Sequence, residues 1–339
     1  MKKLLTISVA AYNVERYITQ TLESLCCSNI DKIEVLVVDD GGSDKTLDIV
    51  NQYHDRFPES IFPIHKENGG WGSTVNYSIE HASGKYFKLL DGDDYFNVRN
   101  LDLLIELLEN TEADTIYTPY VRFDDQTGKV FETFDLSSEY ESGKPLSIAS
   151  LDTLPALDMH SVMFRTDILQ SKKVRITERC FYTDNEFRTK GLAYSDTILI
   201  TSLSLYHYRM GRCGQSVDVA GLRKHYEDCI SAANAVIEFH KTYDGKLSAC
   251  VDACVRNGIT FVYDSLIILG MKDRLQAFDH SLKAYGEVYY NMVSMMVRLL
   301  RKQDFGLLPV ASMLLKARYK YAARIKRLIR ECKGEKKIS

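Results

Sequence analysis

The residues best suited to chemistry in this chain are three carboxylates that follow an apolar run. The segment 88–96 reads KLLDGDDYF and places Asp91, Asp93 and Asp94 within four residues. Carboxylates this close repel one another by roughly a few kcal/mol at the effective dielectric of a protein surface. Hard divalent ions such as Mg²⁺ and Mn²⁺ take oxygen ligands from one or two carboxylates and from nucleotide phosphates. The cluster predicts a metal-diphosphate site, with a solvated acidic turn as the alternative.

A second acidic segment could supply a base. The stretch ERCFYTDNEF (178–187) sets Asp184 and Glu186 among aromatic residues. Apolar surroundings raise the pKa of a carboxylate towards that of a useful general base. The alternative is an ordinary helix cap, in which Asp184 opens the helix NEFRTKGL.

Alternating strand and helix patterns position the first cluster. Strand-like runs are predicted at 6–12, 33–40, 61–67 and 86–90, separated by helical patterns at 15–27 and 44–57 and by a Gly-rich turn into a helix at 68–84. Repeated βα units of this length predict a parallel sheet with helices on both faces.

Polar residues follow three of these strands. Tyr12 and Asn13 follow the first, Asp39 and Asp40 end the second, and residues 91–94 follow a later one. Ligands of such sheets bind beyond the carboxyl ends of the strands. We therefore expect these residues to meet at one edge.

The pattern changes in the second half of the chain. A hairpin is predicted at 120–134, an irregular stretch follows to about residue 217, and a helical pattern begins at Asp218. We predict a catalytic domain over 1–217 and a helical region over 218–339.

Composition restricts the class of protein. The 339 residues are 45% hydrophobic and 26% charged, as in globular proteins, and no apolar run reaches the roughly 20 residues of a membrane span. The opening MKKLLTISVAAYNV resembles a signal peptide, but we interpret it as the first strand. Eight cysteines without a CxxC pair suggest reduced thiols and a cytoplasmic location.

Charge is distributed unevenly. The net charge is −3, yet the stretch from Lys316 to the end carries ten Lys and Arg against two Glu, so the body is acidic. An acidic body argues against nucleic acid as a partner. The tail MLLKARYKYAARIKRLIREC (313–332) predicts an amphipathic helix that could contact the inner face of the cell membrane. The alternative is an exposed helix packed on the body.

Three segments carry a resemblance to a known family. SVAAYNVERYITQTLESL, EVLVVDDGGSDKTLDIV and NGGWGSTVNYSIEHASGKYFKLLDGDDYF resemble, in order and spacing, the first hundred residues of the family 2 nucleotide-sugar glycosyltransferases with the GT-A fold. The resemblance extends more loosely through 159–165 and 181–187 to 206–217, about two thirds of the chain. It implies an α/β architecture, with a Rossmann-like mixed sheet flanked by helices.

The resemblance also implies roles for individual residues. Tyr12 and Asp40 would contact the nucleobase of the donor, Asp91 the ribose, and Asp184 would be the catalytic base of an inverting transfer. The implied donor contacts are Ala10, Tyr12, Glu15, Asp40, Asn68, Gly72, Asp91 and Gly92. The implied ligands of Mn²⁺ or Mg²⁺ are Asp91, Asp93 and His207, with Asp93 as the principal one. Arg209, Arg212 and Gln215 would bind phosphate or close over the donor.

The chain departs from the family pattern in places. Ala10 stands where relatives often have Pro, Gly42 where they often have Ser, and Val75 replaces an Arg that often precedes the residue corresponding to Asn76. One phosphate contact is therefore missing or supplied elsewhere. The Q-x-x-R-W signature of processive synthases is absent, which favours the transfer of one sugar.

Two further side chains have open roles. Trp71, in the Gly-rich turn, could stack on a sugar or pack in the core. His160 could approach the acceptor, although an internal histidine with satisfied hydrogen bonds is the expected alternative.

We expect an inverting, metal-dependent glycosyltransferase that moves one sugar from a nucleotide sugar, UDP-linked by preference, to a glycan or lipid-linked glycan. A sugar nucleotidyltransferase is one alternative, but that class carries a Gly-rich basic phosphate loop after strand one, and this chain has AAYNVERY there. A non-catalytic nucleotide-sugar-binding subunit is the other.

Overall fold

The computed structural model describes residues 2–140, 143–212, 215–216 and 218–316. The chain divides into two compact units, one formed by Met1–Arg212 with Glu238–Val255 and the other by Cys213–Ile237 with Arg256–Ser339. The predicted boundary at 217 lies close to the first division, and residues 238–255 return to the first unit. The predicted basic tail falls almost wholly outside the described residues.

The first unit is built on an eight-stranded mixed sheet with the order β3-β2-β1-β4-β10-β6-β11-β9. Its strands are β1 (Leu5–Ala11), β2 (Ile33–Asp39), β3 (Ile61–His65), β4 (Tyr86–Asp91), β6 (Thr115–Tyr117), β9 (Leu146–Ser147), β10 (Val162–Arg165) and β11 (Thr197–Ile200). The four strands from β3 to β4 are parallel, whereas β10 runs antiparallel to both β4 and β6. The predicted first strand and the mixed α/β class are confirmed.

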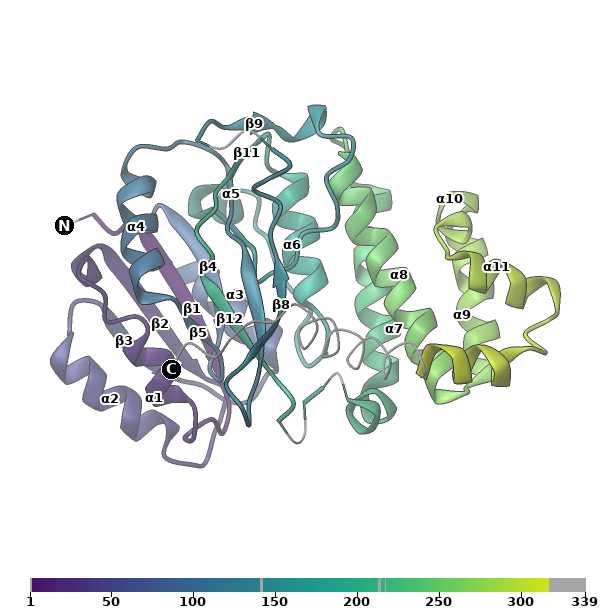
Figure 1. Cartoon of the computed structure of the whole chain (residues 1–339), viewed down its shortest axis with the longest axis horizontal. Helices are drawn as coiled ribbons and strands as arrows, with labels where there is room; N and C mark the ends of the chain where they lie inside the picture. The colour runs from purple at the N-terminus through teal and green to yellow at the C-terminus, as the bar shows by residue number, and fades with distance from the viewer. Residues whose placement is uncertain (1, 141–142, 213–214, 217, 317–339) are drawn as a thin grey trace, which may run out of the picture. The chain divides into compact units, whose positions relative to one another are not determined.

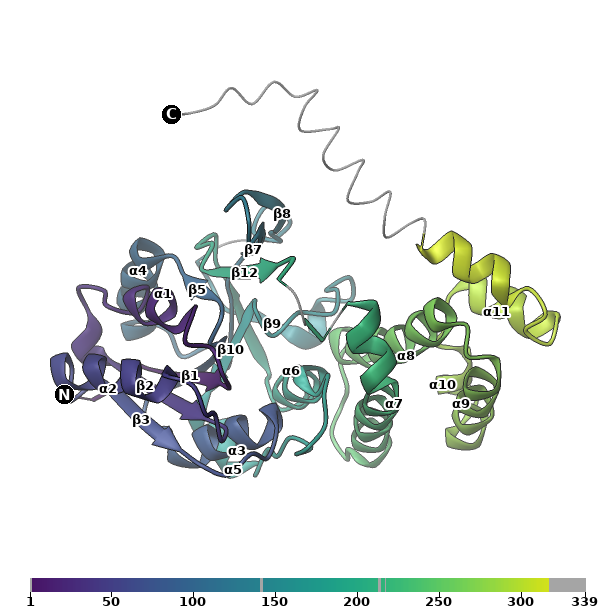
Figure 2. The same ribbon diagram turned by 90° about the horizontal axis from the view of Figure 1, so that it is seen from below.

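Helices cover both faces of this sheet (Figures 1 and 2). One face carries α1 (Ile18–Glu23), α2 (Thr46–Arg56) and α4 (Val98–Glu109), whose apolar side chains share a core with β1 and β2. The other carries α3 (Trp71–His81), α5 (Thr166–Ser171) and α6 (Asp184–Ala193), which share a second core with β10 and β11. The continuous apolar run of β2 is fully buried because the strand lies between these two layers.

A second sheet of four strands has the order β5-β12-β7-β8. Its strands are β5 (Tyr95–Phe96), β7 (Tyr120–Asp124), β8 (Val130–Phe134) and β12 (Tyr206–Met210). β7 and β8 form the predicted antiparallel hairpin. β12 pairs with β5, so this sheet begins directly after the acidic cluster.

Helices make up the described part of the second unit and link it to the first. They are α7 (Val219–Thr242), α8 (Ala249–Leu269), α9 (Lys272–Tyr285), α10 (Glu287–Asn291) and α11 (Met295–Lys302), and residues 308–316 are also helical. α7 and α8 each contribute residues to both units. Within the second unit the Arg301 guanidinium donates to Asp279 at 2.6 Å and to the Tyr263 hydroxyl at 3.0 Å. The predicted helical region is confirmed over the described residues, and none of their helices is long and apolar enough to cross a bilayer.

Candidate functional site

The strand register brings the predicted polar residues to one edge of the large sheet. Ala10 of β1 lies opposite Asp91 of β4, and Ala11 lies opposite Asp39 of β2. Because these strands are parallel, their carboxyl ends meet at the same edge. The convergence expected from the sequence is confirmed.

The acidic loop 91–94 is held in place by α1 and β1. The Thr21 hydroxyl, on α1, lies 3.0 Å from the Gly92 carbonyl and 2.7 Å from the Asp94 carbonyl. The Gly92 amide donates to the Ala10 carbonyl at 2.9 Å. A side chain at Gly92 would place its Cβ 2.9 Å from that same oxygen, so the approach to β1 requires glycine. The predicted donor contacts Ala10 and Gly92 therefore shape the loop through their backbone.

Asp91 accepts a hydrogen bond from the indole of Trp71, Nε1 to Oδ1, at 2.9 Å. Burial, together with the charges of Asp93 and Asp184, raises the pKa of Asp91 to about 7 against the opposing effects of the Trp71 hydrogen bond and of Arg212. The charge of Asp184 therefore acts on the acidic loop. Trp71 is thus a support for Asp91, a role that neither sequence interpretation included.

Two arginines attach to the same loop. Arg212 forms an ion pair with Asp93, Nε to Oδ2, at 2.6 Å. Arg209 donates from Nε to the Asp93 carbonyl at 2.7 Å and from Nη1 to Asp125 at 2.7 Å. These predicted phosphate-binding residues both contact the acidic loop.

Asp94 lies deeper than its neighbours and is 1% exposed. Its two carboxylate oxygens accept from the Tyr206 hydroxyl and from the Arg209 amide, each at 2.7 Å. Burial raises its pKa well above the ordinary value, and the nearby Asp93 and Asp91 charges add to the effect. Sequence reasoning gave this carboxylate no separate role, because no local signal distinguishes it from Asp93.

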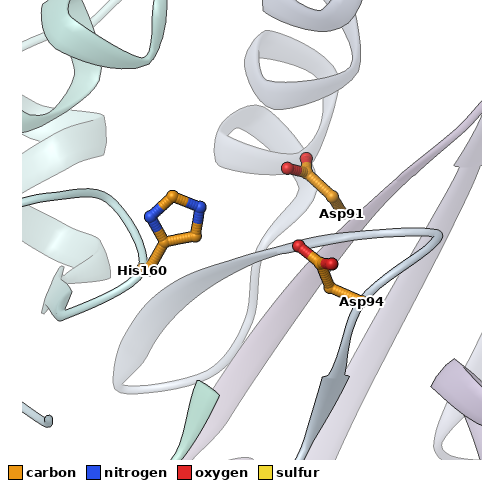
Figure 3. Close-up of side chains that lie close together, drawn as sticks. All are labelled: Asp91, Asp94 and His160. Atoms are coloured by element: carbon orange, nitrogen blue, oxygen red, sulfur yellow. The ribbon is translucent and has the colours of Figure 1, made fainter. Parts of the chain in front are cut away.

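His160 faces this pair of carboxylates across the site (Figure 3). One ligand atom from each of Asp91, Asp94 and His160 lies within 4.8 Å of the other two, and this is the one such set of three among the described residues. Both ring nitrogens are buried without a hydrogen-bond partner. Burial lowers the pKa of His160 to about 3, so the ring is neutral. The expectation of a satisfied internal histidine is wrong.

His207, the predicted third metal ligand, lies on β12 outside this group of three. Its ring stacks on Tyr95, with centroids 4.6 Å apart, and lies 6.5 Å from the ring of Phe123. Burial lowers its pKa. Its role as a ligand stays a prediction.

Asp40, a predicted nucleobase contact, organises the Gly-rich turn before α3. Its carboxylate accepts from the amides of Gly69 at 2.9 Å and Gly70 at 2.8 Å, and from Lys66 Nζ at 2.8 Å. The side chain of Asn68, another predicted donor contact, donates to the Asp40 carbonyl at 2.8 Å. A donor base would have to compete with these partners for the carboxylate.

Hydrogen bonds join the loop after β1 to the loop after β2. The Glu15 amide donates to Asp44 at 2.9 Å, and the Glu15 carboxylate accepts from the Lys45 amide at 3.0 Å. Asn13 adopts a left-handed φ of 52° and accepts from the Ser43 amide at 2.8 Å. Tyr12 is 54% exposed beside these contacts, free to cover a ligand.

Asp184 is the first residue of α6. Burial raises its pKa, and the charge of Arg188, one turn along the helix, opposes the rise. The segment before it follows the Gly-rich turn closely: Asn76 makes two 2.8 Å hydrogen bonds with the backbone of Ile176, and a Cβ at Gly72 would lie 2.2 Å from the Thr177 carbonyl. The predicted donor contact Gly72 is therefore needed for this approach. Asp184 has the predicted raised pKa, but the predicted helix cap is wrong, because Thr183 is the N-cap and Asp184 is the first helical residue.

Three charged residues that sequence reasoning passed over, of which Lys88 and Arg188 are buried, fix the loop that carries His160. Lys88, fully buried in β4, donates to the carbonyls of His160 at 2.7 Å and Val162 at 3.1 Å. Arg188 donates to Asp158 at 2.9 Å, and the Tyr120 hydroxyl also donates to Asp158. A lysine inside an otherwise apolar strand was the one sequence signal for this network.

The oxygen and nitrogen atoms that the acidic loop and His160 offer as metal ligands fit a divalent cation. Asp91 and Asp93 raise the pKa of their neighbours by mutual repulsion, which a cation would relieve. His160 offers unpartnered nitrogen at the same place. Carboxylate oxygens suit Mg²⁺ and Mn²⁺ alike.

Comparison with known proteins gives a family match over the first half of the chain. Residues 6–170 match the model of Glycosyl transferase family 2. This segment runs from β1 through the acidic loop to α5.

Two curated relatives are bacterial proteins. The minor teichoic acid biosynthesis protein GgaB of Bacillus subtilis is 24% identical over 71% of this chain and 27% of its own length. The poly(ribitol-phosphate) beta-N-acetylglucosaminyltransferase TarS of Staphylococcus aureus is 24% identical over 63% of this chain and 37% of its own. The chain spans less than two thirds of the length of these relatives.

Solved structures share the fold. TarS residues 1–349 in complex with UDP-GlcNAc superpose with a TM-score of 0.65 at 20% identity, over 94% of this chain and 92% of that one. The mannosyltransferase PcManGT from Pyrobaculum calidifontis, in complex with GDP-Man and Mn²⁺, gives 0.55 at 15% identity, over 97% and 88%. At these identities the likeness concerns the fold, and it confirms the predicted GT-A arrangement.

Proposed function

We propose that this chain, which belongs to glycosyl transferase family 2, moves one sugar from a nucleoside-diphosphate sugar to a hydroxyl of a polysaccharide or glycolipid precursor, with inversion at the anomeric carbon. The observation that supports the proposal is the Gly-rich turn that contacts both segments: its Trp71 donates to Asp91 at 2.9 Å, and its Gly69 carbonyl accepts at 2.6 Å from the amide of Arg179, five residues before Asp184. A carboxylate cluster suited to a metal-bound diphosphate and a buried carboxylate suited to act as a base thus share one site.

The chain's own residues divide the reaction between them. Asp184 accepts the proton of the acceptor hydroxyl as its oxygen bonds to the anomeric carbon, and the bond from that carbon to the diphosphate breaks with its electron pair on the phosphate oxygen. Attack from the face opposite the diphosphate inverts the configuration. Arg209 and Arg212, which pair with the acidic loop, are available to contact the diphosphate.

Asp91 and Asp93 would hold Mn²⁺ or Mg²⁺ here, and the ion would supply Lewis-acid stabilisation of charge on the leaving diphosphate. Trp71 fixes one oxygen of Asp91 through its 2.9 Å hydrogen bond. The acidic loop is therefore oriented before a ligand arrives.

A UDP-linked donor and a cell-surface acceptor are the finer parts of the proposal. The likeness to TarS in complex with UDP-GlcNAc supports the donor, and the names of TarS and GgaB support the acceptor class. We place the reaction in the cytoplasm, where reduced thiols are expected.

Release of nucleoside diphosphate tests the function. Purified protein is incubated with Mn²⁺, a panel of sugar nucleotides and polyol-phosphate or lipid-linked acceptors. Acceptor-dependent release of nucleoside diphosphate with one donor is the expected result. Pyrophosphate release from a nucleoside triphosphate would instead support a nucleotidyltransferase, and donor binding without turnover against every acceptor would support a non-catalytic subunit.

Replacing Asp93 with alanine is expected to lower the transfer rate by about 10²- to 10³-fold, because the change removes a ligand of the charge-stabilising ion. The rate is measured by nucleoside diphosphate release at saturating Mn²⁺. Asp125→Ala, which removes another acid bound to Arg209, is the matched control and should retain most of the activity. Full activity of Asp93→Ala would count against a metal clamp.

We also propose that the second unit binds an anionic membrane surface. Apolar side chains are exposed on α11 and on residues 308–316, among them Met295, Leu299, Val310, Met313 and Leu314. Exposed Arg298 and Lys302 lie between them, and residues 317–339 add nine Lys and Arg against two Glu. Apolar contact and positive charge together match the surface of an anionic leaflet.

Vesicle sedimentation measures this binding. The protein should bind vesicles containing phosphatidylglycerol, bind phosphatidylcholine vesicles far more weakly, and be released by salt, since surface charges are screened. Met313→Asp should weaken binding roughly 10- to 100-fold, the expected loss for one buried apolar side chain. Leu103→Asp, at an exposed position of α4, should have no effect. Equal binding to both lipids, or an inert Met313→Asp, would contradict the proposal.

A further inference from the structure

His160 is buried in a position that its surroundings fix on every side. Its side chain is 9% exposed, and its ring stacks on Tyr208 at 4.3 Å and Tyr120 at 5.1 Å and meets Tyr206 edge-on at 4.8 Å. The ammonium group of Lys88 donates a hydrogen bond to the His160 carbonyl oxygen at 2.7 Å. The ring therefore has little freedom to find another partner.

The polar atoms of this ring are unused. Neither Nδ1 nor Nε2 has a hydrogen-bond partner, although buried polar atoms are nearly always bonded. A phenyl ring would fill the same aromatic cage without this penalty. The imidazole is therefore better explained by a ligand that the nitrogen meets than by packing.

The ring faces the carboxylates of Asp91 and Asp94 (Figure 3), and one ligand atom from each of the three lies within 4.8 Å of the other two. An imidazole nitrogen that carries no proton presents a lone pair, and here it would face the lone pairs of two carboxylates. Such a set is stable when a cation lies between its members. Asp94 keeps capacity for one, because each carboxylate oxygen has a second lone pair beyond its bond from Tyr206 or Arg209.

We propose that His160 supplies a nitrogen ligand to the divalent ion that the acidic loop 91–94 would hold, and that His207 does not. The inference rests on the proposed function for the presence of an ion at this loop. His207 Nδ1 is also buried without a hydrogen-bond partner, but His207 lies outside the set of Asp91, Asp94 and His160, and its ring stacks on Tyr95. The place of the nitrogen ligand is therefore on the loop before β10, not on β12.

A nitrogen ligand from the protein should make the site prefer Mn²⁺ over Mg²⁺. Mg²⁺ is bound through oxygen and dehydrates reluctantly, whereas imidazole suits borderline transition metals. The full-length protein should therefore bind Mn²⁺ at least about tenfold more tightly than Mg²⁺, and removing the imidazole should reduce that ratio towards unity.

Electron spin-echo measurements on Mn²⁺ bound to the full-length protein, with UDP and no acceptor, test the ligand directly. Modulation by ¹⁴N is expected in the wild type and in His207→Phe and is expected to vanish in His160→Phe, whose affinity for Mn²⁺ should fall about 10- to 100-fold. Modulation that persists in His160→Phe, or vanishes in His207→Phe, overturns the inference. Absence of Mn²⁺ binding by the wild type also overturns it.

A second measurement guards against a variant that does not fold. When wild-type protein is labelled with ¹⁵N-histidine, the ¹⁴N modulation of the Mn²⁺ spin echo should be replaced by ¹⁵N modulation. Unlabelled His160→Gln should lack the ¹⁴N modulation and keep the circular dichroism spectrum of the wild type. An unchanged pattern in labelled wild type rules out any histidine ligand. These readouts do not depend on sugar transfer, so nitrogen ligation without transfer would refute the proposed function alone, and transfer without nitrogen ligation would refute this inference alone.

Discussion

Asp184→Asn is expected to slow sugar transfer by about 10²- to 10⁴-fold and to leave donor affinity nearly unchanged, because the amide cannot accept the proton of the acceptor hydroxyl. The side chains are nearly the same size, so the start of α6 should be preserved. The rate is measured at saturating donor, and donor affinity is measured separately by calorimetry. Asp152→Asn, in an exposed loop of the same unit, is the control and should behave as wild type.

The pH dependence of the rate gives a second test of Asp184. Burial raises its pKa, and a base works only when deprotonated, so the rate should be constant above this raised pKa and fall about tenfold per pH unit below it. The residual rate of Asp184→Asn should lack this acid limb. If the variant keeps the wild-type rate and pH profile, Asp184 is a helix-start residue and nothing more.

The βα pattern of the first hundred residues was sufficient to predict the edge where the site lies. Strand identity followed from apolar runs such as β2, and parallel pairing followed from the helices between them. Because parallel strands end together, Asp40 and Asp91 could be placed near each other without knowing the register. Local sequence is informative here because the units are short and consecutive.

The network behind the site could not be predicted in this way. His160 and Asp158 come from a segment about 65 residues beyond the acidic loop, and Arg188 comes from α6, about 95 residues beyond it. No periodicity reports which side chains from distant elements meet in a core. The buried Lys88 breaks the apolar pattern of β4, and such a break is the kind of signal that marks a buried polar network.

Trp71 shows the same limit on a smaller scale. Its place in a Gly-rich turn suggested a sugar platform or core packing, and both interpretations concern the ring. The structure uses the indole N–H, which donates to Asp91. The direction of one side chain decides between these roles, and direction depends on the packing of α3 against β4 rather than on sequence neighbours.

Arg188→Met is expected to lower the free energy of unfolding at pH 7 by about 1–3 kcal/mol, because the change leaves the hydrogen-bond partners of the buried guanidinium unsatisfied, while the partly exposed Asp158 carboxylate can be hydrated. Arg188 is 3% exposed and donates to Asp158 at 2.9 Å and to Asn185 at 2.8 Å. Urea denaturation measures the change. Arg175→Met, which removes an exposed pair with Glu80, should cost less than about 1 kcal/mol.

Two further observations separate the charge of Arg188 from its bulk. The double variant Arg188→Met/Asp158→Asn should be more stable than Arg188→Met alone, because no carboxylate is left without its ion-pair partner. Arg188 also lowers the pKa of Asp158 against the effect of burial. A lowered carboxyl pKa stabilises the folded protein above the ordinary carboxyl pKa, and this stabilisation is lost as the pH falls through the lowered pKa. The difference in unfolding free energy between wild type and Arg188→Met should therefore become smaller in acid. The same guanidinium opposes the raised pKa of Asp184. Without it the acid limb of the transfer rate should move to higher pH, a shift that a loss of packing alone would not produce.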